Sequence, residues 1–262
     1  MKLQYIKESL ENSGLKDVIY YSQLHSTNKY AKENNIESDN LIITPYQYEG
    51  RGRFNRIWES LEGDNLTFSI VKSFKINTKN VFIVNFYISY IVLKAIKEIF
   101  PDYMQYNFTL KWPNDLLLKN KKFGGILSEL INVKDDEKKF IIGVGINVNQ
   151  RDFSENISKK ATSLRKETGI IFELEELLIR IVKEFYANIN LLNDTDKILN
   201  LWKSNSQIIN KEVKFRKTAD NIEINGKIIN VESDGGIKIE TVDEFNNKKY
   251  SVYYTGEISF IY

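Results

Sequence analysis

The segment KWPNDLLLKNKKFGGILSELINVKDDEKKFIIGVGINVN, residues 111–149, holds three apolar stretches separated only by short polar turns. DLLLK and FGGILSELINV flank the turn NKK, and KFIIGVGINVN follows the turn KDDEK. Strand segments joined by such short turns pair as antiparallel hairpins. We therefore expect a sheet that is at least partly antiparallel, with further strands at 41–44, 66–72 and 108–112.

Helices are predicted around these strands. The segment 173–192 carries apolar residues at spacings of three and four, the period of an amphipathic helix, and 26–35 is predicted as a short helix. The segment 78–100 contains the run VFIVNFYISYIVLKAI, but polar residues interrupt it well before the roughly 20 residues of a membrane span. We interpret it as a buried helix ended by Pro101. Helices mixed with antiparallel strands predict an α+β fold.

The pattern of predicted elements changes after Trp202. From about Asn210 the chain holds only short strand segments, namely EVKFRK, IEINGKIINVE, GIKIETV and KYSVYYTGEISF, broken by Asn-Gly, Asp-Gly-Gly and Asn-Asn. Short strands with such turns are typical of a small β barrel. We expect a main α+β domain over residues 1–208 and an all-β domain over 209–262.

Composition excludes several classes of protein. The 262 residues are 42% hydrophobic, and 37 Lys and Arg against 35 Asp and Glu leave a formal net charge of +2, which does not predict binding to nucleic acid or anionic membranes. With no Cys and one His (His25), a disulfide framework, a thiol nucleophile and a multi-histidine metal site are excluded. The N-terminus has no apolar signal segment, so a cytoplasmic location is expected.

The segment GRGRFNRIW, residues 50–58, concentrates cationic side chains beside two glycines. Arg51, Arg53 and Arg56 offer paired donors for a carboxylate or phosphate, and the glycines let the backbone approach a ligand. The segment is neither a P-loop, because no Lys-Ser or Lys-Thr follows, nor a dinucleotide-binding GxGxxG. A solvated basic turn is the alternative for this segment taken alone.

A second group of polar residues flanks the first hairpin. Lys111, Asn114 and Asp115 lie around a Trp-Pro corner, and Lys122 directly precedes Phe123 and two glycines. Glycines in a strand mark a place where a ligand can approach the backbone closely. The alternative is that Lys122 is an ordinary charge of a hairpin turn.

The segment IIGVGINVN, residues 141–149, leaves one strand face bare. Because side chains alternate along a strand, Gly143, Gly145 and Asn147 share one face and branched apolar residues share the other. Two successive glycines weaken a strand relative to alanine, so something else is expected to fill the space. Either a bulky neighbouring side chain does so, or a flat ligand lies there with the Asn147 amide at a base edge.

Together these segments predict a site for two anionic reactants, such as a carboxylate and a nucleoside triphosphate. The repulsion of two unit charges about 4 Å apart is on the order of 4 kcal/mol at an effective dielectric constant near 20. Fixed cations offset this repulsion and hold the reactants together.

In this order the segments resemble the biotin protein ligase family. Further matching strings are HSTN at 25–28, ATSL at 161–164 and TGEISF at 255–260, so the resemblance runs from about residue 20 to the end of the chain. The resemblance implies a catalytic domain similar to class II aminoacyl-tRNA synthetases, followed by an SH3-like barrel. It also implies the monofunctional class that lacks an N-terminal DNA-binding domain.

The activity that this resemblance implies is ATP-dependent biotin–[acetyl-CoA-carboxylase] ligase. Such an enzyme makes biotinyl-5′-AMP from biotin and ATP with Mg²⁺, releases pyrophosphate and transfers biotin to a lysine of a biotin carboxyl carrier protein or domain. Beyond ATP, Mg²⁺ and biotin, no tightly bound prosthetic group is expected. Neither DNA nor a membrane is an expected partner, and a homodimer is left open.

The resemblance also implies roles at matching positions. Lys122 corresponds to the lysine that neutralises the reacting carboxylate and phosphate, and Trp58 to the residue that packs on adenine. Catalytic roles are implied for Lys122, Arg53 and Lys111. Biotin contacts are implied for Ser26, Thr27, Asn28, Gln47, Gly50, Arg51, Arg53, Lys122, Gly125, Gly143 and Gly145. ATP or adenylate contacts are implied for Arg51, Arg53, Arg56, Trp58, Lys111, Asn114, Asp115 and Asn147, with Asp115 also implied at Mg²⁺.

One position departs from the family pattern. Asn55 stands where the family commonly has a third glycine. Asn is the non-glycine residue that best tolerates the left-handed conformation, so we expect the turn to be kept. We also expect residues 48–63 to be mobile without ligand and to order on binding. The sequence names no base for deprotonating the acceptor lysine.

Three other interpretations compete with this one. A lipoate-type ligase shares the architecture and the adenylation chemistry, but GRGR and KWPND favour biotin. A biotin-responsive repressor carries an N-terminal DNA-binding domain of about 60 residues, whereas 24 residues precede HSTN here. A binding protein with a degenerate site is disfavoured because the charged residues of the motifs are intact, namely Arg51, Arg53, Lys111, Asp115 and Lys122.

Overall fold

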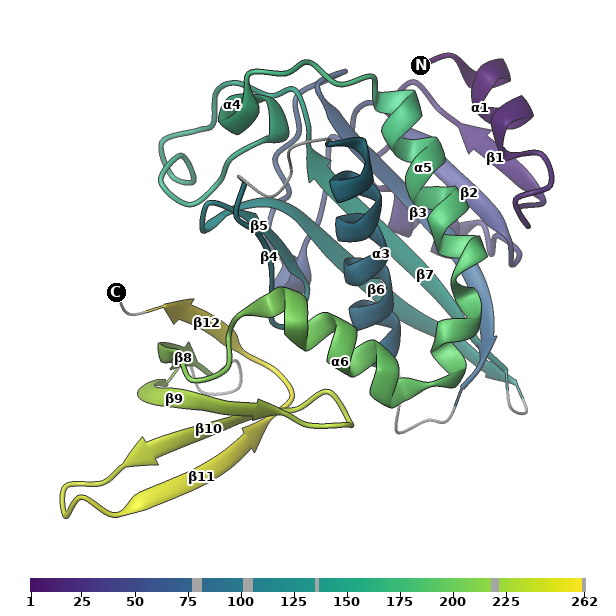
Figure 1. Ribbon diagram of the computed structural model, residues 1–262. Helices are drawn as coiled ribbons and strands as arrows, with labels where there is room; N and C mark the ends of the chain where they lie inside the picture. Colours follow the sequence, from purple (N-terminus) through teal and green to yellow (C-terminus); the bar gives the residue numbers. More distant parts are fainter. Residues whose placement is uncertain (77–81, 101–105, 135–136, 218–221, 261–262) are drawn as a thin grey trace.

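The computed structural model describes residues 1–76, 82–100, 106–134, 137–217 and 222–260. Figure 1 shows a large sheet crossed on one face by two long helices, with a smaller sheet at the C-terminal end of the chain. The two helices are α3 (Ile83–Ile99) and α5 (Leu174–Ala187). This arrangement confirms the predicted α+β fold with a C-terminal all-β unit.

The large sheet has seven strands in the order β1-β2-β3-β7-β6-β5-β4. Only β1 and β2 pair in parallel, and the other neighbours are antiparallel, as predicted for the hairpin segment. The long central strands β3, β6 and β7 carry the apolar runs that were expected to be strands. The strand bounds are β1 (Asp17–Tyr20), β2 (Asn40–Thr44), β3 (Asn65–Lys75), β4 (Phe108–Lys111), β5 (Asp115–Leu118), β6 (Lys121–Lys134) and β7 (Glu137–Asn147).

Helices cover both faces of this sheet. α3 is buried along most of its length against the main core, while α2 (Thr27–Glu33) packs on the opposite face, where its Ala31 joins a small cluster with β2, β3 and β7. The predicted start of α3 at residues 78–81 lies outside the described residues. Within the described part of the chain, none of the helices has the length and apolar character needed to cross a membrane.

The helix predicted over 173–192 is shorter than expected. α5 ends at Ala187, and a 3₁₀ helix over Ile189–Asn193 follows it. The reason is Asn188, whose backbone N–H and side-chain amide both donate to the Glu184 carbonyl, at 3.1 and 2.9 Å. A polar side chain that competes for a helical carbonyl favours a helix end.

Three further α-helices lie in the described ranges of the chain, namely α1 (Leu3–Leu10), α4 (Leu164–Thr168) and α6 (Thr195–Ser206). α1 packs against α5, and α6 contacts α3 and β4. Figure 1 shows α6 running between the large sheet and the C-terminal strands.

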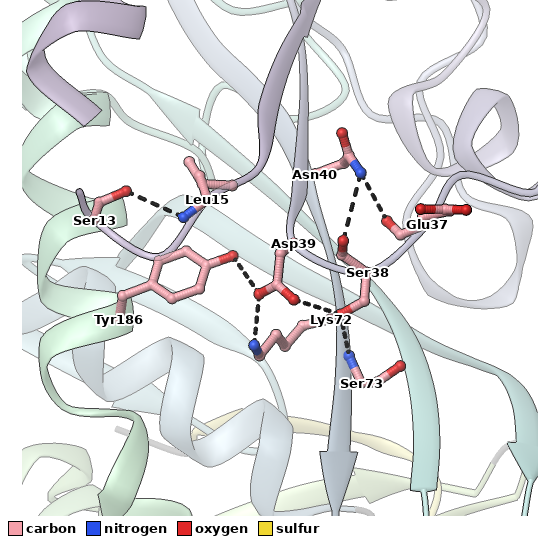
Figure 2. A network of polar contacts seen from close by, with 9 residues as sticks. All are labelled: Ser13, Leu15, Glu37, Ser38, Asp39, Asn40, Lys72, Ser73 and Tyr186. Carbon is pink, nitrogen blue, oxygen red and sulfur yellow. Dashed lines mark hydrogen bonds and ion pairs between the residues drawn. The ribbon is translucent and has the colours of Figure 1, made fainter. Parts of the chain in front are cut away.

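A polar cluster ties α5 to β3 and to the chain just before β2 (Figure 2). Lys72 Nζ lies 2.5 Å from Asp39 Oδ1, and the Tyr186 hydroxyl donates to the same oxygen at 3.2 Å. The Asp39 carbonyl accepts from the Lys16 backbone at 2.7 Å. Asp39 thus joins three parts of the chain: its carboxylate holds Lys72 of β3 and Tyr186 of α5, and its backbone carbonyl holds the segment that leads into β1.

The C-terminal sheet has five antiparallel strands in the order β11-β10-β9-β8-β12. KYSVYYTGEISF, expected as one strand, is two strands, because the chain turns at Gly256, where φ is 152° and a side chain would collide with the Phe215 ring. The strand bounds are β8 (Glu212–Arg216), β9 (Glu223–Val231), β10 (Ile237–Val242), β11 (Lys248–Tyr253) and β12 (Glu257–Phe260).

The two sheets meet where the KWPND segment leaves β4. Trp112 is buried, its indole nitrogen donates to the Gly235 carbonyl at 3.0 Å, and its ring lies 6.3 Å from that of Phe215. The peptide bond between Trp112 and Pro113 is cis. One continuous apolar core includes buried side chains from both sheets. The corner that carries Asn114 and Asp115 is therefore fixed against the C-terminal sheet.

Candidate functional site

The segment 50–58 forms a tight turn between β2 and β3. Gly52 N–H donates to the Arg56 carbonyl at 2.8 Å, and Trp58 N–H donates to the Gly50 carbonyl at 2.9 Å. At the tip, Phe54 and Asn55 both have φ of 58°, in the left-handed region. Asn55 thus adopts the left-handed conformation that it was expected to tolerate at this position. The expected ordering of residues 48–63 on ligand binding stays a prediction.

Two arginines of this turn face the junction of the sheets. Arg56 forms an ion pair with Glu257 of β12. Burial lowers the pKa of the Arg53 guanidinium, whereas the nearby Asp115 and Glu257 carboxylates raise it and Arg56 lowers it. The third arginine, Arg51, is exposed, and its guanidinium donates to Asn55 Oδ1 at 3.4 Å. The turn therefore brings Arg53, more than Arg51, to the acid of the KWPND segment.

Two lysines, Lys111 and Lys122, lie next to Asp115. Lys122 Nζ lies 2.6 Å from Asp115 Oδ1, and Lys111 is paired with Asp115 across the β4–β5 hairpin. Burial lowers the pKa of Lys111, the charges of Asp115 and Glu257 raise it, and that of Lys122 lowers it. Asp115 is thus flanked by cationic side chains, as expected where anions are to be bound.

The bare face of β7 lies beside these lysines and is filled by side chains. The indole of Trp58 covers Gly145 and borders Gly125, with its ring centroid 5.6 Å from Lys122 Nζ. Asn28 fills the space over Gly143. Of the two alternatives that the sequence left open, the bulky neighbour describes this structure. Trp58 Nε1 is buried without a hydrogen-bond partner, so the indole retains a free donor.

A buried polar cluster continues along the same face. The Thr27 backbone and hydroxyl both donate to Gln47 Oε1, at 2.8 and 3.2 Å, and the Ser69 hydroxyl lies 2.7 Å from Thr27 Oγ1 and 2.6 Å from Asn28 Oδ1. Ser26, also buried, is the residue directly before α2. Because both Thr27 donors take the Gln47 oxygen, the Gln47 amide nitrogen remains available as a donor.

Two predicted contact residues use their amides within the protein. Asn28 Nδ2 donates to the Leu127 carbonyl at 3.0 Å and to Glu129 Oε2 at 2.8 Å. Asn114 is buried, and its amide donates to the Ile126 carbonyl. These contacts fix α2 to β6 and the Pro corner to β6. The roles of Asn28 and Asn114 in ligand binding stay predictions.

Asn147 differs from these two. Its Nδ2 donates to the Thr162 carbonyl at 3.1 Å, while its Oδ1 is buried and has no hydrogen-bond partner. Buried polar atoms in proteins are nearly always paired, so a lone acceptor at the end of the glycine face indicates a place for a donor from a ligand.

Asp115 is the residue assigned to a metal ion. No group of three or more His, Asp or Glu side chains suited to a metal ion is found among the residues that the structure describes. The single His is engaged elsewhere, since His25 Nδ1 accepts from the Ser26 backbone at 2.7 Å and Nε2 lies 3.1 Å from Glu33 Oε2.

Sequence reasoning missed several residues that build the site. Ser69 is a buried polar residue in the part of β3 that is rich in apolar residues, a signal that the sequence did contain. Thr162 and Glu257 lie in the matching strings ATSL and TGEISF, but neither string indicated the partner, which is Asn147 for Thr162 and Arg56 for Glu257. Glu129 gave no signal, because its partner Asn28 lies 101 residues away in the chain.

Comparison with known proteins identifies relatives of this fold and site. The Biotin/lipoate A/B protein ligase family matches over residues 20–147. The bifunctional ligase/repressor BirA of Bacillus subtilis is 30% identical over 241 residues, which cover 89% of this chain and 72% of the relative. BirA of Escherichia coli is 28% identical, with 73% and 60% covered.

Solved structures give the same result. The biotin protein ligase of Aquifex aeolicus, solved in complex with biotin and ATP, superposes with a TM-score of 0.74 at 30% identity, covering 94% of this chain and 99% of that protein. The biotin protein ligase of Leishmania major shares the fold, with a TM-score of 0.63 at 17% identity. The chain therefore belongs to the biotin/lipoate A/B protein ligase family, and within it to the biotin protein ligases.

Proposed function

We propose that this chain joins biotin to ATP to form biotinyl-5′-AMP and then transfers the biotinyl group to a lysine of a carrier protein. One observation carries the proposal. Arg53, Lys111 and Lys122 gather around Asp115, next to the glycine face under Trp58. Such a cluster suits the meeting of two anions, and the related Aquifex aeolicus enzyme was solved with biotin and ATP.

The buried polar cluster supports biotin at one end of the site. The Gln47 amide nitrogen and the Ser26 and Thr27 hydroxyls supply donors and acceptors for the ureido group of biotin. The apolar chain of biotin would then run over the glycines of β6 and β7 toward Lys122. Because Trp58 covers Gly145 and Asn28 fills the space over Gly143, these two side chains would have to share or yield the space above the glycines when biotin binds.

In the first step, an oxygen of the biotin carboxylate attacks the α-phosphorus of ATP. A new carbon-bound oxygen–phosphorus bond forms, the bond from the α-phosphorus to the bridging oxygen breaks, and pyrophosphate leaves. The carboxylate is already ionised at neutral pH, so no base is needed. Lys122, Arg53 and Lys111 reduce the repulsion between the two anions and stabilise charge on the phosphate oxygens.

Lys122 is suited to change partners during this step. Its side chain is 37% exposed and its ammonium pairs with Asp115, whose side chain is 23% exposed, so the ion pair is accessible from solvent. An exposed ion pair is weak, typically about 1 kcal/mol or less, and an incoming anion can therefore compete for the ammonium.

A Mg²⁺ ion that arrives with the nucleotide fits the residues present. Mg²⁺ in nucleotide sites is held by one or two carboxylates together with substrate phosphates and water, without an all-protein cage. Asp115 and Glu257, both near Lys111, are the carboxylates that could hold it. When bound, the ion would neutralise charge on the triphosphate.

In the second step, the neutral amine of the acceptor lysine attacks the carbonyl carbon of biotinyl-5′-AMP. An amide bond forms, the bond from this carbon to the phosphate oxygen breaks, AMP leaves, and the amine proton is lost to solvent or a base. We propose a biotin carboxyl carrier domain as the acceptor.

Biotin-dependent exchange of labelled pyrophosphate into ATP tests the first step. We expect exchange with biotin and none with lipoate. Exchange that lipoate stimulates and biotin does not would show a lipoate-type ligase instead, and no exchange with either acid would refute the proposed function.

A further inference from the structure

A short segment before α4 braces two residues of the candidate site. The Lys122 backbone N–H donates to the Lys160 carbonyl at 2.8 Å, and the Lys122 carbonyl accepts from the Thr162 N–H at 2.9 Å. Residues 160–162 therefore run alongside the start of β6 as one more parallel pairing, with Lys122 opposite Ala161. The backbone that presents the Lys122 ammonium is held on this side by Thr162.

Thr162 also orients Asn147. Its carbonyl accepts from Asn147 Nδ2 at 3.1 Å, which fixes which end of the amide points into the site. The end that remains is Oδ1, the buried acceptor without a partner. An acceptor selects a donor, and the donor on the edge of adenine is its 6-amino group.

The Thr162 side chain is in turn held by a carboxylate outside the site. Thr162 is fully buried, and its hydroxyl donates to Glu167 Oε1 at 2.6 Å. The other oxygen of Glu167 lies 3.2 Å from Lys119 Nζ, in the turn between β5 and β6. Glu167 thus bridges the segment 160–162 and the turn, which lie on opposite sides of Lys122 in the sheet.

The charge of Glu167 favours this bridge. Burial raises the pKa of its carboxyl, but the hydrogen bond from Thr162 and the ammonium of Lys119 lower it by more, and the pKa is lowered. The carboxylate is therefore ionised at neutral pH and acts as a strong, charge-assisted acceptor. Its side chain is only 14% exposed, so water competes poorly for the same bonds.

We propose that Glu167 is a positioning residue for the nucleotide, which acts through the Thr162 hydroxyl to set the Asn147 acceptor and the Lys122 backbone. This inference rests on the proposed function, because it assigns the adenine edge to Asn147. Neither Glu167 nor Thr162 touches the reacting atoms. Their contribution is to hold Asn147 Oδ1 and the Lys122 backbone in fixed positions relative to each other.

The test compares ATP with an analogue that lacks the 6-amino group, using biotin-dependent pyrophosphate exchange. Wild type should prefer ATP in kcat/KM. In Thr162→Val, which keeps the shape but loses the hydroxyl, we expect the preference for ATP to fall about three- to tenfold, the effect of a weakened buried hydrogen bond. The KM for biotin should stay within about twofold, because Thr27 and Gln47 lie on other elements.

Conservative variants separate positioning from general damage. Thr162→Ser keeps the hydroxyl and Glu167→Gln keeps an acceptor, so both should retain most of the preference, whereas Glu167→Ala should lose it as Thr162→Val does. Thr168→Val is the matched control, because its hydroxyl bonds only to the Leu164 carbonyl and the Ile170 backbone, at the far end of α4.

The outcomes distinguish this inference from the proposed function. An unchanged preference for ATP in Thr162→Val and Glu167→Ala, or a wild type that does not distinguish the two nucleotides, would overturn the inference. If Thr162→Val does not fold, Glu167→Ala decides alone. Equal changes in the KM values for ATP and biotin would indicate a purely structural role. Wild type without biotin-dependent exchange would instead refute the proposed function.

Discussion

The indole ring of Trp58 rests on the backbone of Gly145. A Cβ added at Gly145 would lie 2.7 Å from Trp58 Cε2, closer than real side chains approach one another. Gly125 on the neighbouring strand borders the same ring, since its added Cβ would lie 3.7 Å from Cζ3. Because they lack side chains, these two glycines leave a flat surface, the Trp58 seat, on which an aromatic ring packs beside Lys122.

Gly145→Ala should displace Trp58 from this seat. The methyl group would push the indole off β7, and we expect a change in tryptophan fluorescence together with at least about a tenfold loss of biotin-dependent exchange, equivalent to roughly 1.4 kcal/mol. Thr168→Val is the control, because its hydroxyl bonds to the Leu164 carbonyl at the end of α4, away from the glycine face. Unchanged fluorescence and exchange in Gly145→Ala would contradict the role of the glycine face.

Lys122→Met should abolish most of the adenylation activity without unfolding the protein. Removing one fixed cation from a site that stabilises developing charge costs on the order of 10²- to 10³-fold in kcat. Because the ion pair with Asp115 is partly exposed, the free energy of unfolding should change by about 1 kcal/mol or less. Lys121→Met changes the neighbouring lysine and should exchange pyrophosphate nearly as wild type. Similar activities in the two variants would argue against Lys122 as the reacting cation.

Arg53→Gly should release biotinyl-5′-AMP into solution. The Arg53 guanidinium is half-buried near Asp115 and Glu257, and its loss removes a charge that retains the adenylate phosphate. We expect biotin to appear on lysines of a bystander protein such as serum albumin, detected by streptavidin blot. A variant that is active in exchange yet leaves the bystander unlabelled would show that Arg53 does not retain the adenylate.

Stability should fall above about pH 10, in part because of Tyr186. Burial raises the pKa of Tyr186, and the Asp39 carboxylate raises it further, so the folded state disfavours the phenolate (Figure 2). As the pH rises, Tyr186 therefore loses its proton at a lower pH in the unfolded chain than in the folded protein. The stabilisation is therefore present below the unfolded pKa and is lost as pH rises, by up to about 1.4 kcal/mol per pH unit.

Urea unfolding at pH 8 and pH 11 measures this loss. Tyr186→Phe removes the ionisable group, so its free energy of unfolding should fall less between the two pH values than that of wild type. Equal decreases in both proteins would show that Tyr186 does not contribute.

The sequence predicted the strands that are rich in apolar residues, short ones such as β2, β4 and β5 included, and missed elements that depend on context. β3, β6 and β7 were visible because apolar residues dominate each of them. The four-residue β1 and the mixed sequence of α6 have no such signal, and their burial comes from packing on β2 and α3. The turn at Gly256 depends on Phe215, a contact that a local pattern does not contain.

In the candidate site too, some features were visible in the sequence and others depend on tertiary packing. The motifs predicted that Lys122 and Asp115 lie in one site, and the structure brings them within 2.6 Å. No motif indicated that Trp58 fills the space over Gly145, or that Thr162 holds Asn147, because these pairs are brought together only by the folded sheet. Spacing in a sequence identifies candidate groups, whereas the partner of each group depends on tertiary packing.

Intact mass spectrometry of an acceptor protein measures biotin transfer itself. The protein is mixed with biotin, ATP, Mg²⁺ and a biotin carboxyl carrier domain, with Lys122→Met and lipoate in parallel reactions. We expect the carrier to gain the mass of one biotinyl group on a single lysine, the gain to require ATP, and no gain with Lys122→Met or with lipoate. A carrier that stays unmodified by the wild-type protein, or gains a lipoyl group instead, would contradict the proposed function.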